Sequence, residues 1–596
     1  MKATGTDTMK NEIKYEKSEL ELMTTYQLRE ICRREKIMNG VIHPLDKEEL
    51  IQTIMRYMGK RQDFFICDKK KGGEERVEEF LKKTRIVIKP CKELYCQSQI
   101  LAYEGLSIEY YDGYTIPYKK ELSGTNAFLM GSDMTLCAIL NLKEHGERQE
   151  KLYLTKAAEL EIRETQRKDY RIFCMGRQTS ESLYHLYYGE HTILPEHIEV
   201  YSIPLIDFVV RKPVTLMLPM AIDFGSVNTT AGVYLDSAYF ENVGEQAAVK
   251  NCRENEINYT AFEDGAGESM LLPSVIGVLA VEEEDDKLLF GYDAIRLANA
   301  SYVDEGFCVF YDVKRWIGEY EKEEEIVDRQ GRRRLVKRAE ILRRFFLYII
   351  RKTENRFKCR ISQVHISSPV KQKHYFRRMF REILPEYMIN QEIMLDEGMA
   401  VLYNTISNML EQDTLEENEE YEALIIDCGG GTTDLCSYRF RIQDRRAAYK
   451  IYMETTYENG DTDFGGNNIT YRIMQILKIA LVRATGNQNV SSVKEILEYM
   501  DTDIYRFIDS HGVKEFYQYL EQEYQKAEET LPTRFADFER YNRSEYYKVK
   551  NNFYTLFNTA EQIKKLFYGK VGALEVTVTS EQKGQRENTV LLDKWK

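Results

Sequence analysis

The chain has 596 residues, of which 43% are hydrophobic and 12% aromatic, which is enough apolar material for roughly two to four domains with cores of their own. Its formal net charge of −14 excludes a general attraction to nucleic acid or anionic lipid. The longest apolar runs, such as 214–222, reach about half a membrane span, so no membrane span is expected. The first residues carry no secretory signal, and the eleven cysteines form no CxxC pair. We therefore expect reduced thiols, no zinc and a cytoplasmic location.

Residues 19–60 predict two helices with an extended piece between them. Thr24 with Gln27, and Asp46 with Glu49, each form a capping-box pattern before an apolar run of helical spacing. This order resembles the SAP-like helix-extended-helix module, whose members often bind nucleic acid. The segment holds seven Lys or Arg against seven Asp or Glu, so nucleic-acid binding through it is a minor alternative to an ordinary solvated helix face.

The next two segments differ in pattern. Residues 61–80 are rich in charge and include CDKKKGGEE, which predicts a linker. Residues 81–213 alternate apolar and polar positions, with an Asp112-Gly113 turn, and predict a β-rich domain of unknown role, either a sandwich or a small barrel. No constellation of reactive side chains is found there, and a binding role for a protein partner is the remaining hypothesis.

Two later segments match each other, and each predicts a strand, a tight turn and a second strand. Residues 220–235 are MAIDFGSVNTTAGVYL, and residues 424–439 are LIIDCGGGTTDLCSYR. In both, an apolar pair precedes an aspartate, and a glycine follows two residues later. Asp427 comes 204 residues after Asp223. The sequence therefore predicts an internal repeat at the scale of a domain.

The chemistry of the two turns indicates a metal-bound phosphate. Glycines leave backbone N–H groups free to converge on an anion. An aspartate beside them would repel a bare phosphate, but Mg²⁺ bound through carboxylates, waters and phosphate oxygens removes the conflict. Two such hairpins facing one another would hold a polyphosphate between two related domains.

Further segments complete a resemblance to a known superfamily. LLPSVIGV at 271–278, YDVKRWIGE at 311–319, ENGDTDFGGNNI at 458–469 and AEQIKKLF at 560–567 follow in order with the two hairpins. Together they resemble the actin, sugar-kinase and heat-shock chaperone ATPases, and most closely the 70-kDa heat-shock chaperones. The resemblance covers about 220–571. It implies an α/β fold: an actin-like, two-lobed ATPase domain made of a duplicated mixed sheet with helices.

The resemblance also implies a site for ATP and Mg²⁺ and gives its residues roles. The metal shell would come from Asp223, Asp427 and Asp434. The catalytic residues would be Lys314, Glu397, Asp427 and Thr432, with Lys314 neutralising the γ-phosphate and Glu397 orienting a water. The phosphate-binding residues would be Gly225, Ser226, Val227, Gly429, Gly430, Gly431 and Thr432. Adenosine would contact Glu561, Lys564 and Lys565, which share one helix face.

The sequence departs from the family at a few positions. Gly398 stands where these chaperones have a proline, and no Gly-Gly-x-Ser/Thr loop follows Gly572. The first lobe is expected over 214–420, and the second over 421–596, incomplete at its carboxyl end. Residues 495–567 are expected to be mostly helical, with their tyrosines used for packing.

The resulting expectation is an ATPase that acts as a chaperone-like molecular switch. Its lobes would bind ATP or ADP, close on Mg-ATP, and pass the closure to a protein client or partner. Alternatives from other classes are an actin-like filament-forming ATPase, a catalytically inactive nucleotide-binding scaffold, and a small-molecule kinase.

Overall fold

The computed structural model describes the greater part of the chain. The described residues are 15, 20, 22–34, 47, 50–51, 54–55, 64–145, 150–165, 169–243, 251–264, 267–282, 286–300, 308–328, 331–369, 373–389, 396–445, 448–461, 464–492, 494–496, 504–535, 543–568, 573–579 and 587–593. Among them, no helix is both long and apolar enough to cross a membrane. All eleven cysteines are free thiols, as the sequence predicts.

The amino-terminal helix α2 (Thr25–Arg34) begins at the predicted capping box. The backbone N–H of Thr24 donates to Gln27 Oε1 at 2.8 Å, and the N–H of Gln27 donates to Thr24 Oγ1 at 3.3 Å. Leu28 and Ile31 pack against Leu50, Ile51 and Ile54. The second capping box, at Asp46 and Glu49, lies outside the described residues.

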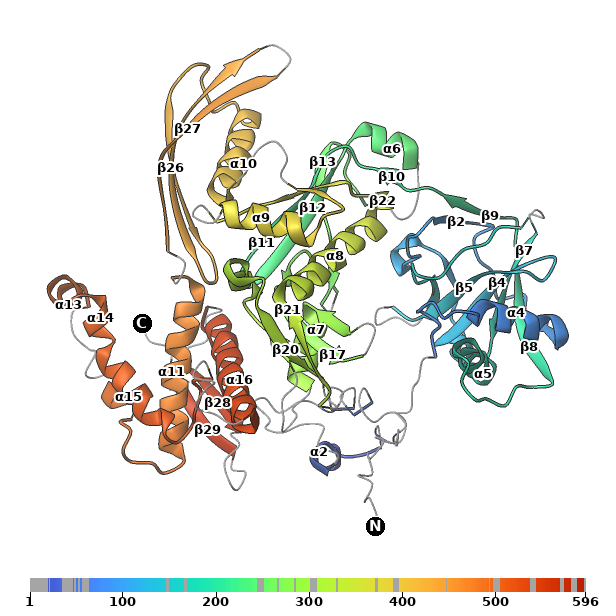
Figure 1. Cartoon of the computed structure of the whole chain (residues 1–596), viewed down its shortest axis with the longest axis horizontal. Coiled ribbons are helices and arrows are strands. Elements are labelled where there is room, and N and C mark those ends of the chain that lie inside the picture. The colour runs from blue at the N-terminus through green and yellow to red at the C-terminus, as the bar shows by residue number, and fades with distance from the viewer. Residues whose placement is uncertain are drawn as a thin grey trace.

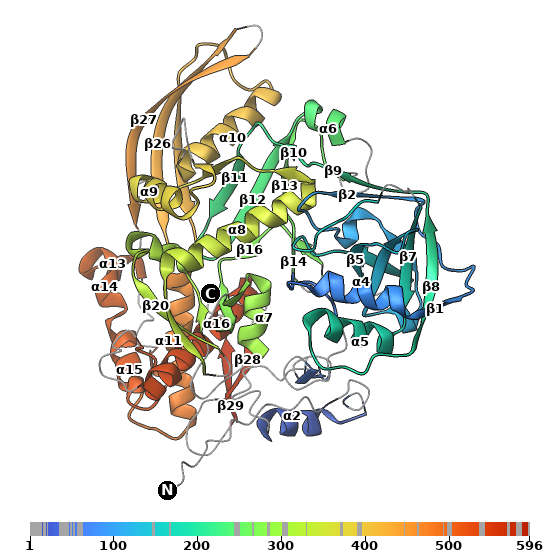
Figure 2. The same cartoon turned by 45° about the vertical axis from the view of Figure 1, so that its right-hand side comes forward.

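A seven-stranded sheet forms the amino-terminal sheet domain (Figures 1 and 2). Its edge strands are β1, which pairs in parallel with β8, and β3, which pairs antiparallel with β6. On one face, the parallel pair of β2 (Gln99–Tyr103) and β9 (Asp207–Arg211) adds Ile100 and Phe208 to the core. The strand order is β1 (Arg85–Lys89), β8 (His197–Leu205), β7 (Tyr170–Met175), β4 (Thr125–Gly131), β5 (Leu136–Lys143), β6 (Lys151–Thr155) and β3 (Thr115–Pro117).

Two helices cover the other face of this sheet and correct the sequence interpretation. Helix α4 (Gly73–Lys83) occupies part of the predicted linker 61–80, and α5 (Arg177–Tyr188) lies beside it (Figure 1). Val77 of α4 and Leu183 of α5 are fully buried against the strands. The domain is therefore a seven-stranded sheet with helices on one face and the β2–β9 pair on the other. The sheet is not closed into a barrel, because β1 and β3 lie at its two edges.

The central domain is built on a six-stranded mixed sheet. Helix α8 (Arg338–Phe357) and α9 (Lys373–Ile383) contribute to its core, where Phe346 and Phe380 pack edge-on against Phe224. The strand order is β13 (Glu256–Tyr259), β12 (Asn228–Leu235), β11 (Met220–Phe224), β23 (Gln363–Ile366) and β24 (Met388–Ile389), with β16 (Leu272–Pro273) also paired to β12.

Smaller elements surround this sheet. Helix α7 (Tyr292–Ala300) contacts the sheet of β17, whereas α6 (Ser237–Val243) contacts β10. The small pairings are β18 (Lys287–Phe290), β17 (Ile276–Ala280) and β19 (Val309–Phe310); β20 (Glu323–Val327) and β21 (Arg333–Lys337); β14 (Phe262–Glu263) and β15 (Glu268–Ser269); and β10 (Val214–Thr215) and β22 (Cys359–Arg360).

A separate three-stranded antiparallel sheet follows, and it projects from the body as a long curved ribbon (Figure 1). Its strands are β25 (Tyr421–Cys428), β26 (Thr433–Asp444) and β27 (Tyr449–Asp461), in that order. Helix α10 (Glu397–Glu411) packs on one face through Leu402 and Ile406. The fold is thus α/β with mixed sheets, as the sequence predicts at that coarser level.

The carboxyl-terminal helical unit confirms the expected helical segment. It contains α11 (Gly466–Ala484), α13 (Ile504–His511), α14 (Val513–Phe516), α15 (Gln518–Glu528) and α16 (Arg543–Tyr568), and the hairpin of β28 (Ala573–Thr579) and β29 (Glu587–Asp593) follows. Tyr524 is buried in the core of this unit, so this predicted packing tyrosine does pack.

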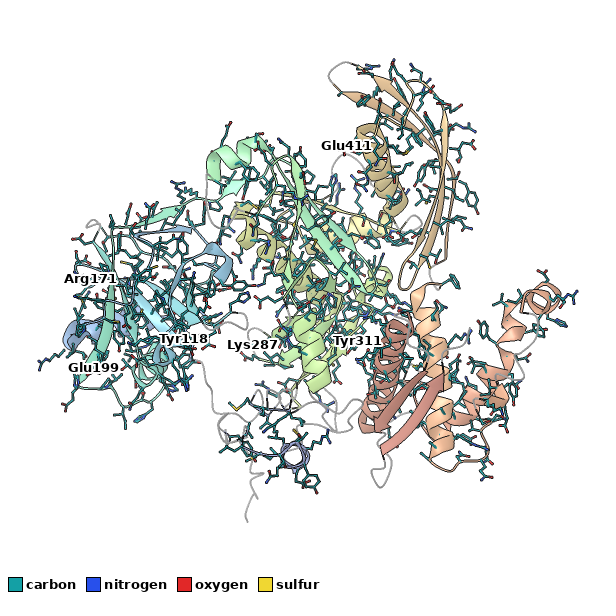
Figure 3. The ribbon with its side chains drawn as sticks, turned by 180° about the vertical axis from the view of Figure 1, so that it is seen from behind. Tyr118, Arg171, Glu199, Lys287, Tyr311 and Glu411 are labelled. Carbon is teal, nitrogen blue, oxygen red and sulfur yellow. The ribbon has the colours of Figure 1, made fainter. Side chains whose placement is uncertain are left out.

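Two junctions join these parts. Tyr311 of the central domain stacks on Tyr554 of α16 at 4.6 Å between ring centroids (Figure 3). At the other junction, Lys358 Nζ lies 3.1 Å from Asp112 Oδ2 of the amino-terminal sheet domain, and both side chains are only 4% exposed. Lys358 also donates to the Ser107 carbonyl oxygen at 2.7 Å. A buried ion pair therefore fixes the amino-terminal sheet domain to the end of α8.

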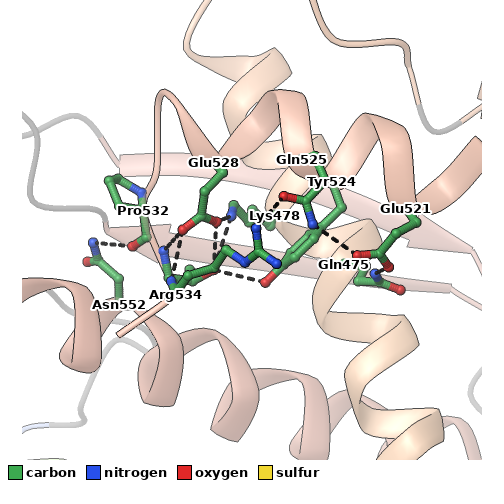
Figure 4. A network of polar contacts seen from close by, with 10 residues as sticks. Gln475, Lys478, Glu521, Tyr524, Gln525, Glu528, Pro532, Arg534 and Asn552 are labelled. Carbon is green, nitrogen blue, oxygen red and sulfur yellow. Dashed lines mark hydrogen bonds and ion pairs between the residues drawn. The ribbon is translucent and has the colours of Figure 1, made fainter. Parts of the chain in front are cut away.

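A buried polar network holds α11 against α15 (Figure 4). The Lys478 side chain is fully buried, forms an ion pair with Glu528 and donates to Thr533 Oγ1 at 3.0 Å. Burial lowers the pKa of Lys478 to about 8. Burial alone would raise the pKa of Glu528, but Lys478 and two backbone N–H groups hold it below its ordinary value. The pair is stable only while both charges are present.

We expect Glu528→Gln to lower the free energy of unfolding by about 3 kcal/mol, because it leaves the Lys478 ammonium buried without a counter-charge. Urea unfolding followed by circular dichroism measures the change. Glu529→Gln is the matched control, since it makes the same substitution one residue further along at an exposed position. Equal stability of the two variants would contradict this account of the network.

Candidate functional site

The first predicted hairpin is formed by β11 and β12. Asp223 of β11 lies opposite Thr230 of β12, and Phe224 lies opposite Thr229. The turn closes where the Gly225 N–H donates to the Asn228 carbonyl oxygen at 3.1 Å.

The second hairpin, of β25 and β26, repeats this geometry residue for residue. Asp427 lies opposite Asp434, and Cys428 lies opposite Thr433. The Gly429 N–H donates to the Thr432 carbonyl oxygen at 2.9 Å. Every one of these positions is 204 residues after its counterpart in the first hairpin. At the scale of the hairpin, the predicted repeat is therefore present in the hydrogen-bond register as well as in the sequence.

The two turns touch each other tip to tip, and the glycines make this contact possible. A Cβ atom placed on Gly430 would lie 2.3 Å from Val227 Cγ2, and one placed on Gly431 would lie 3.1 Å from Ser226 Oγ. Both approaches are closer than ordinary van der Waals contact. Gly430 and Gly431 are thus required by the close approach of the first turn, whereas Gly429 does not face it.

A buried ion pair lies behind the turns. Lys314 Nζ is 2.9 Å from Glu397 Oε1, with the two side chains 7% and 11% exposed. Lys314 belongs to a short 3-10 helix, Val313–Glu319, that follows Asp312 in a left-handed conformation with φ 53°. Glu397 is the first residue of α10, whose amino terminus is capped by the Asp396 side chain. The two elements bring together charges that are 83 residues apart.

The acidic residues of both hairpins act on this pair. Burial raises the pKa of the Glu397 carboxyl to about 7, while the Lys314 ammonium opposes the rise. The charges of Asp223 and Asp434 raise it further. Burial and the charge of Asp223 also raise the pKa of Asp427, and Lys314 lowers it. The predicted catalytic and metal-binding carboxylates therefore lie within electrostatic reach of one another and of Lys314.

These carboxylates suit a metal held largely through water and phosphate. In the part of the chain that the structure describes, no group of three Asp, Glu, His or Cys side chains could by itself hold a metal ion. Mg²⁺ needs no such cage, because it keeps several waters and takes one or two protein carboxylates. Asp223 is exposed, and its Oδ1 accepts a hydrogen bond from Ser367 Oγ at 2.8 Å.

Helix α16 contacts the start of α11 through two of the three residues predicted to bind adenosine. Lys564 Nζ donates to the Gly466 carbonyl oxygen at 3.3 Å and lies 2.6 Å from Glu561 Oε2. Thr470 of α11 donates to Glu561 at 2.6 Å. Lys565 is exposed. Glu561 and Lys564 thus share one helix face as predicted, but Lys565 does not take part in these contacts.

Sequence reasoning missed two residues at the site. Ser367, which binds Asp223, follows strand β23 in the segment VHISSP. Asn467 lies at the start of α11, where its backbone N–H donates to the Gly430 carbonyl oxygen at 2.6 Å and its side chain lies close to Gly430 and Gly431. In the sequence, Ser367 and Asn467 are marked only by their positions next to segments of the family resemblance.

The departure at Gly398 has a steric reason. A Cβ atom at this position would lie 3.0 Å from Cys436 Sγ and 3.0 Å from the Tyr438 hydroxyl. Tyr438 also donates to Asp396 Oδ1 at 3.0 Å, which links β26 to the start of α10. Glycine therefore allows α10, and with it Glu397, to lie close against the second hairpin.

Comparison with protein-family models and with curated proteins gives no match. The interpretation of the site therefore rests on its geometry and on the residues that form it.

We expect Gly430→Ala to lower the free energy of unfolding by about 1–3 kcal/mol, because its methyl group overlaps the Val227 side chain. Adding Val227→Ala should restore most of the loss. Gly429→Ala serves as control, since a Cβ atom there would meet its nearest neighbour at 3.4 Å, an ordinary contact. Thermal unfolding distinguishes the variants; equal losses at 429 and 430, or no rescue, would show that the turns do not touch.

Proposed function

We propose that the chain is an actin-like, two-lobed Mg-ATPase that acts as a nucleotide-driven molecular switch. The observation that carries the proposal is the pair of hairpins with identical register, whose turns touch and whose aspartates lie within electrostatic reach of the buried Lys314–Glu397 pair. In this proposal the central domain is one lobe. The three-stranded sheet and the carboxyl-terminal helical unit form the other.

The chain's own residues supply what phosphoryl transfer needs. In this proposal, the turn N–H groups that do not close the hairpins would bind phosphate oxygens, with Ser226 and Thr432 beside them. Lys314 carries a positive charge in a nearly dry site, where it stabilises negative charge more strongly than in water. Mg²⁺, when bound, would neutralise phosphate charge near Asp223, Asp427 and Asp434. With a pKa of about 7, Glu397 can take a proton from an attacking water near neutral pH.

The contact between the turns provides the switch. Any group that enters between Val227 and Gly430 must move the two hairpins apart, because they are already in contact. Lys564 joins α16 to Gly466 at the start of α11, and the Gly466 N–H donates to the Gly429 carbonyl oxygen of the second turn. This supports placing adenosine beside Glu561 and Lys564. The Lys358–Asp112 ion pair offers a route by which movement reaches the amino-terminal sheet domain and a protein partner.

Single-turnover ATP hydrolysis tests this function directly. Lys314→Ala should slow the chemical step by about a hundredfold, because it removes a cation placed to stabilise the transition state. Asp427→Asn should weaken the effect of Mg²⁺ on the same step. Lys322→Ala is the control, since Lys322 is 60% exposed in the same segment. A wild type that fails to bind Mg-ATP at millimolar concentration would refute the function; binding without turnover would leave a nucleotide-binding scaffold.

The pH profile tests the role of Glu397. Its carboxylate form takes the proton, so the hydrolysis rate should fall as the pH decreases through about 7. Glu397→Gln should be slow and should lose this inflection. The folded state binds a proton here that the unfolded chain releases near its ordinary pKa of 4.5, so this group also makes the protein less stable as the pH rises from 4.5 to about 7. A rate independent of pH in this range would exclude Glu397 as the base.

A further inference from the structure

Strand β25 has one open edge. In the three-stranded sheet the strand order is β25, β26 and β27, so among the described residues no strand pairs with the other side of β25. Leu424 and Ile426 are 61% and 64% exposed. An exposed edge that carries large apolar side chains is a template for another strand.

The internal repeat shows what normally covers such an edge in this molecule. Strand β11 is the counterpart of β25, but it has β12 on one side and β23, in parallel, on the other. Met220 and Ile222 correspond to Leu424 and Ile426, and they are 0% and 2% exposed. The same strand is therefore covered in its first copy and uncovered in its second.

The hydrogen-bonding groups of β25 also match those that β11 uses. In β11, the Ile222 carbonyl oxygen accepts from the Ser367 N–H at 3.1 Å, beyond the end of β23. In β25, the pair that closes the turn is Gly429 with Thr432. Hydrogen-bonded and non-hydrogen-bonded residue pairs alternate along an antiparallel ladder. Counting back from Gly429, the residues Leu424 and Ile426 are in non-hydrogen-bonded pairs with β26. Their N–H and C=O groups therefore point to the open edge.

One face of β25 is open as well as its edge. Helix α10 packs on the opposite face, where it contacts Ile425. In the central domain, the face that carries Met220 and Ile222 is packed in the core with α8 and α9. To cover β25 as fully as β11 is covered in the central domain, a binding partner would have to supply both a strand and an apolar helix.

We propose that the β25 edge, with Leu424 and Ile426, binds an extended apolar strand of a protein partner in parallel orientation, as β23 binds β11. Main-chain hydrogen bonds would give affinity, and the alternate apolar side chains would give specificity. This binding mode differs from dimerisation of the chain. In a symmetric dimer, two β25 edges related by a two-fold axis would pair antiparallel and not parallel.

The test uses a labelled peptide with the sequence of residues 360–369, RISQVHISSP, which contains the strand that covers β11. Fluorescence anisotropy with the full chain should show saturable binding, and a scrambled peptide should not bind. Hydrogen exchange should slow at the amides of Leu424 and Ile426. Leu424→Lys and Ile426→Lys should each weaken binding by about tenfold or more. Tyr449→Lys, at a 55% exposed position at the start of β27, should leave it unchanged.

Three results would overturn the proposal. The first is an absence of saturable binding. The second is binding that the two lysine substitutions leave intact, or protection of amides elsewhere. The third is a dimer of the free chain in sedimentation experiments that Leu424→Lys dissociates, because the edge would then be an interface between copies of this chain.

Discussion

The contact between the two glycine turns is the constraint on which the site depends. Two hairpins 204 residues apart approach until no side chain fits at Gly430, and this approach brings Asp223, Asp427 and Asp434 around Lys314 and Glu397. Each turn closes with a backbone hydrogen bond, of 3.1 Å in the first hairpin and 2.9 Å in the second. A ligand that entered between them would therefore act on two domains at once, as the proposed switch requires.

The electrostatics of the site follow from burial. A lysine and a glutamate that are almost fully removed from water are stable together, but neither is stable alone. The free-energy cost of burying the Glu397 carboxylate raises its pKa to about 7, so the carboxyl exchanges its proton near neutral pH. The same rule governs Lys478 with Glu528 and Lys358 with Asp112. The molecule thus uses buried ion pairs both where its parts join and where its candidate chemistry lies.

The two copies of the repeat have the same hydrogen-bond register in the hairpin, but the sheets that contain them differ. The first copy lies inside a six-stranded sheet, whereas the second lies at the edge of three strands. Two hairpins with the same hydrogen-bond register therefore contribute to one candidate site, although the sheets around them differ. The covered strand gives the central domain its core, and the uncovered strand leaves Leu424 and Ile426 at the surface.

Local patterns alone determined much of this protein: the Thr24–Gln27 cap, the two hairpins and the helical carboxyl-terminal segment. Each depends on residues only a few positions apart. The tertiary structure decided what lies far apart in sequence. Helix α4 was mistaken for a linker because its charged sequence offers few apolar residues, and the sheet beneath it provides the burial that makes it a helix. Ser367 and Asn467 could not be identified, because their neighbours belong to other elements. The sequence set the chemistry available to the site, and long-range packing decided which groups meet.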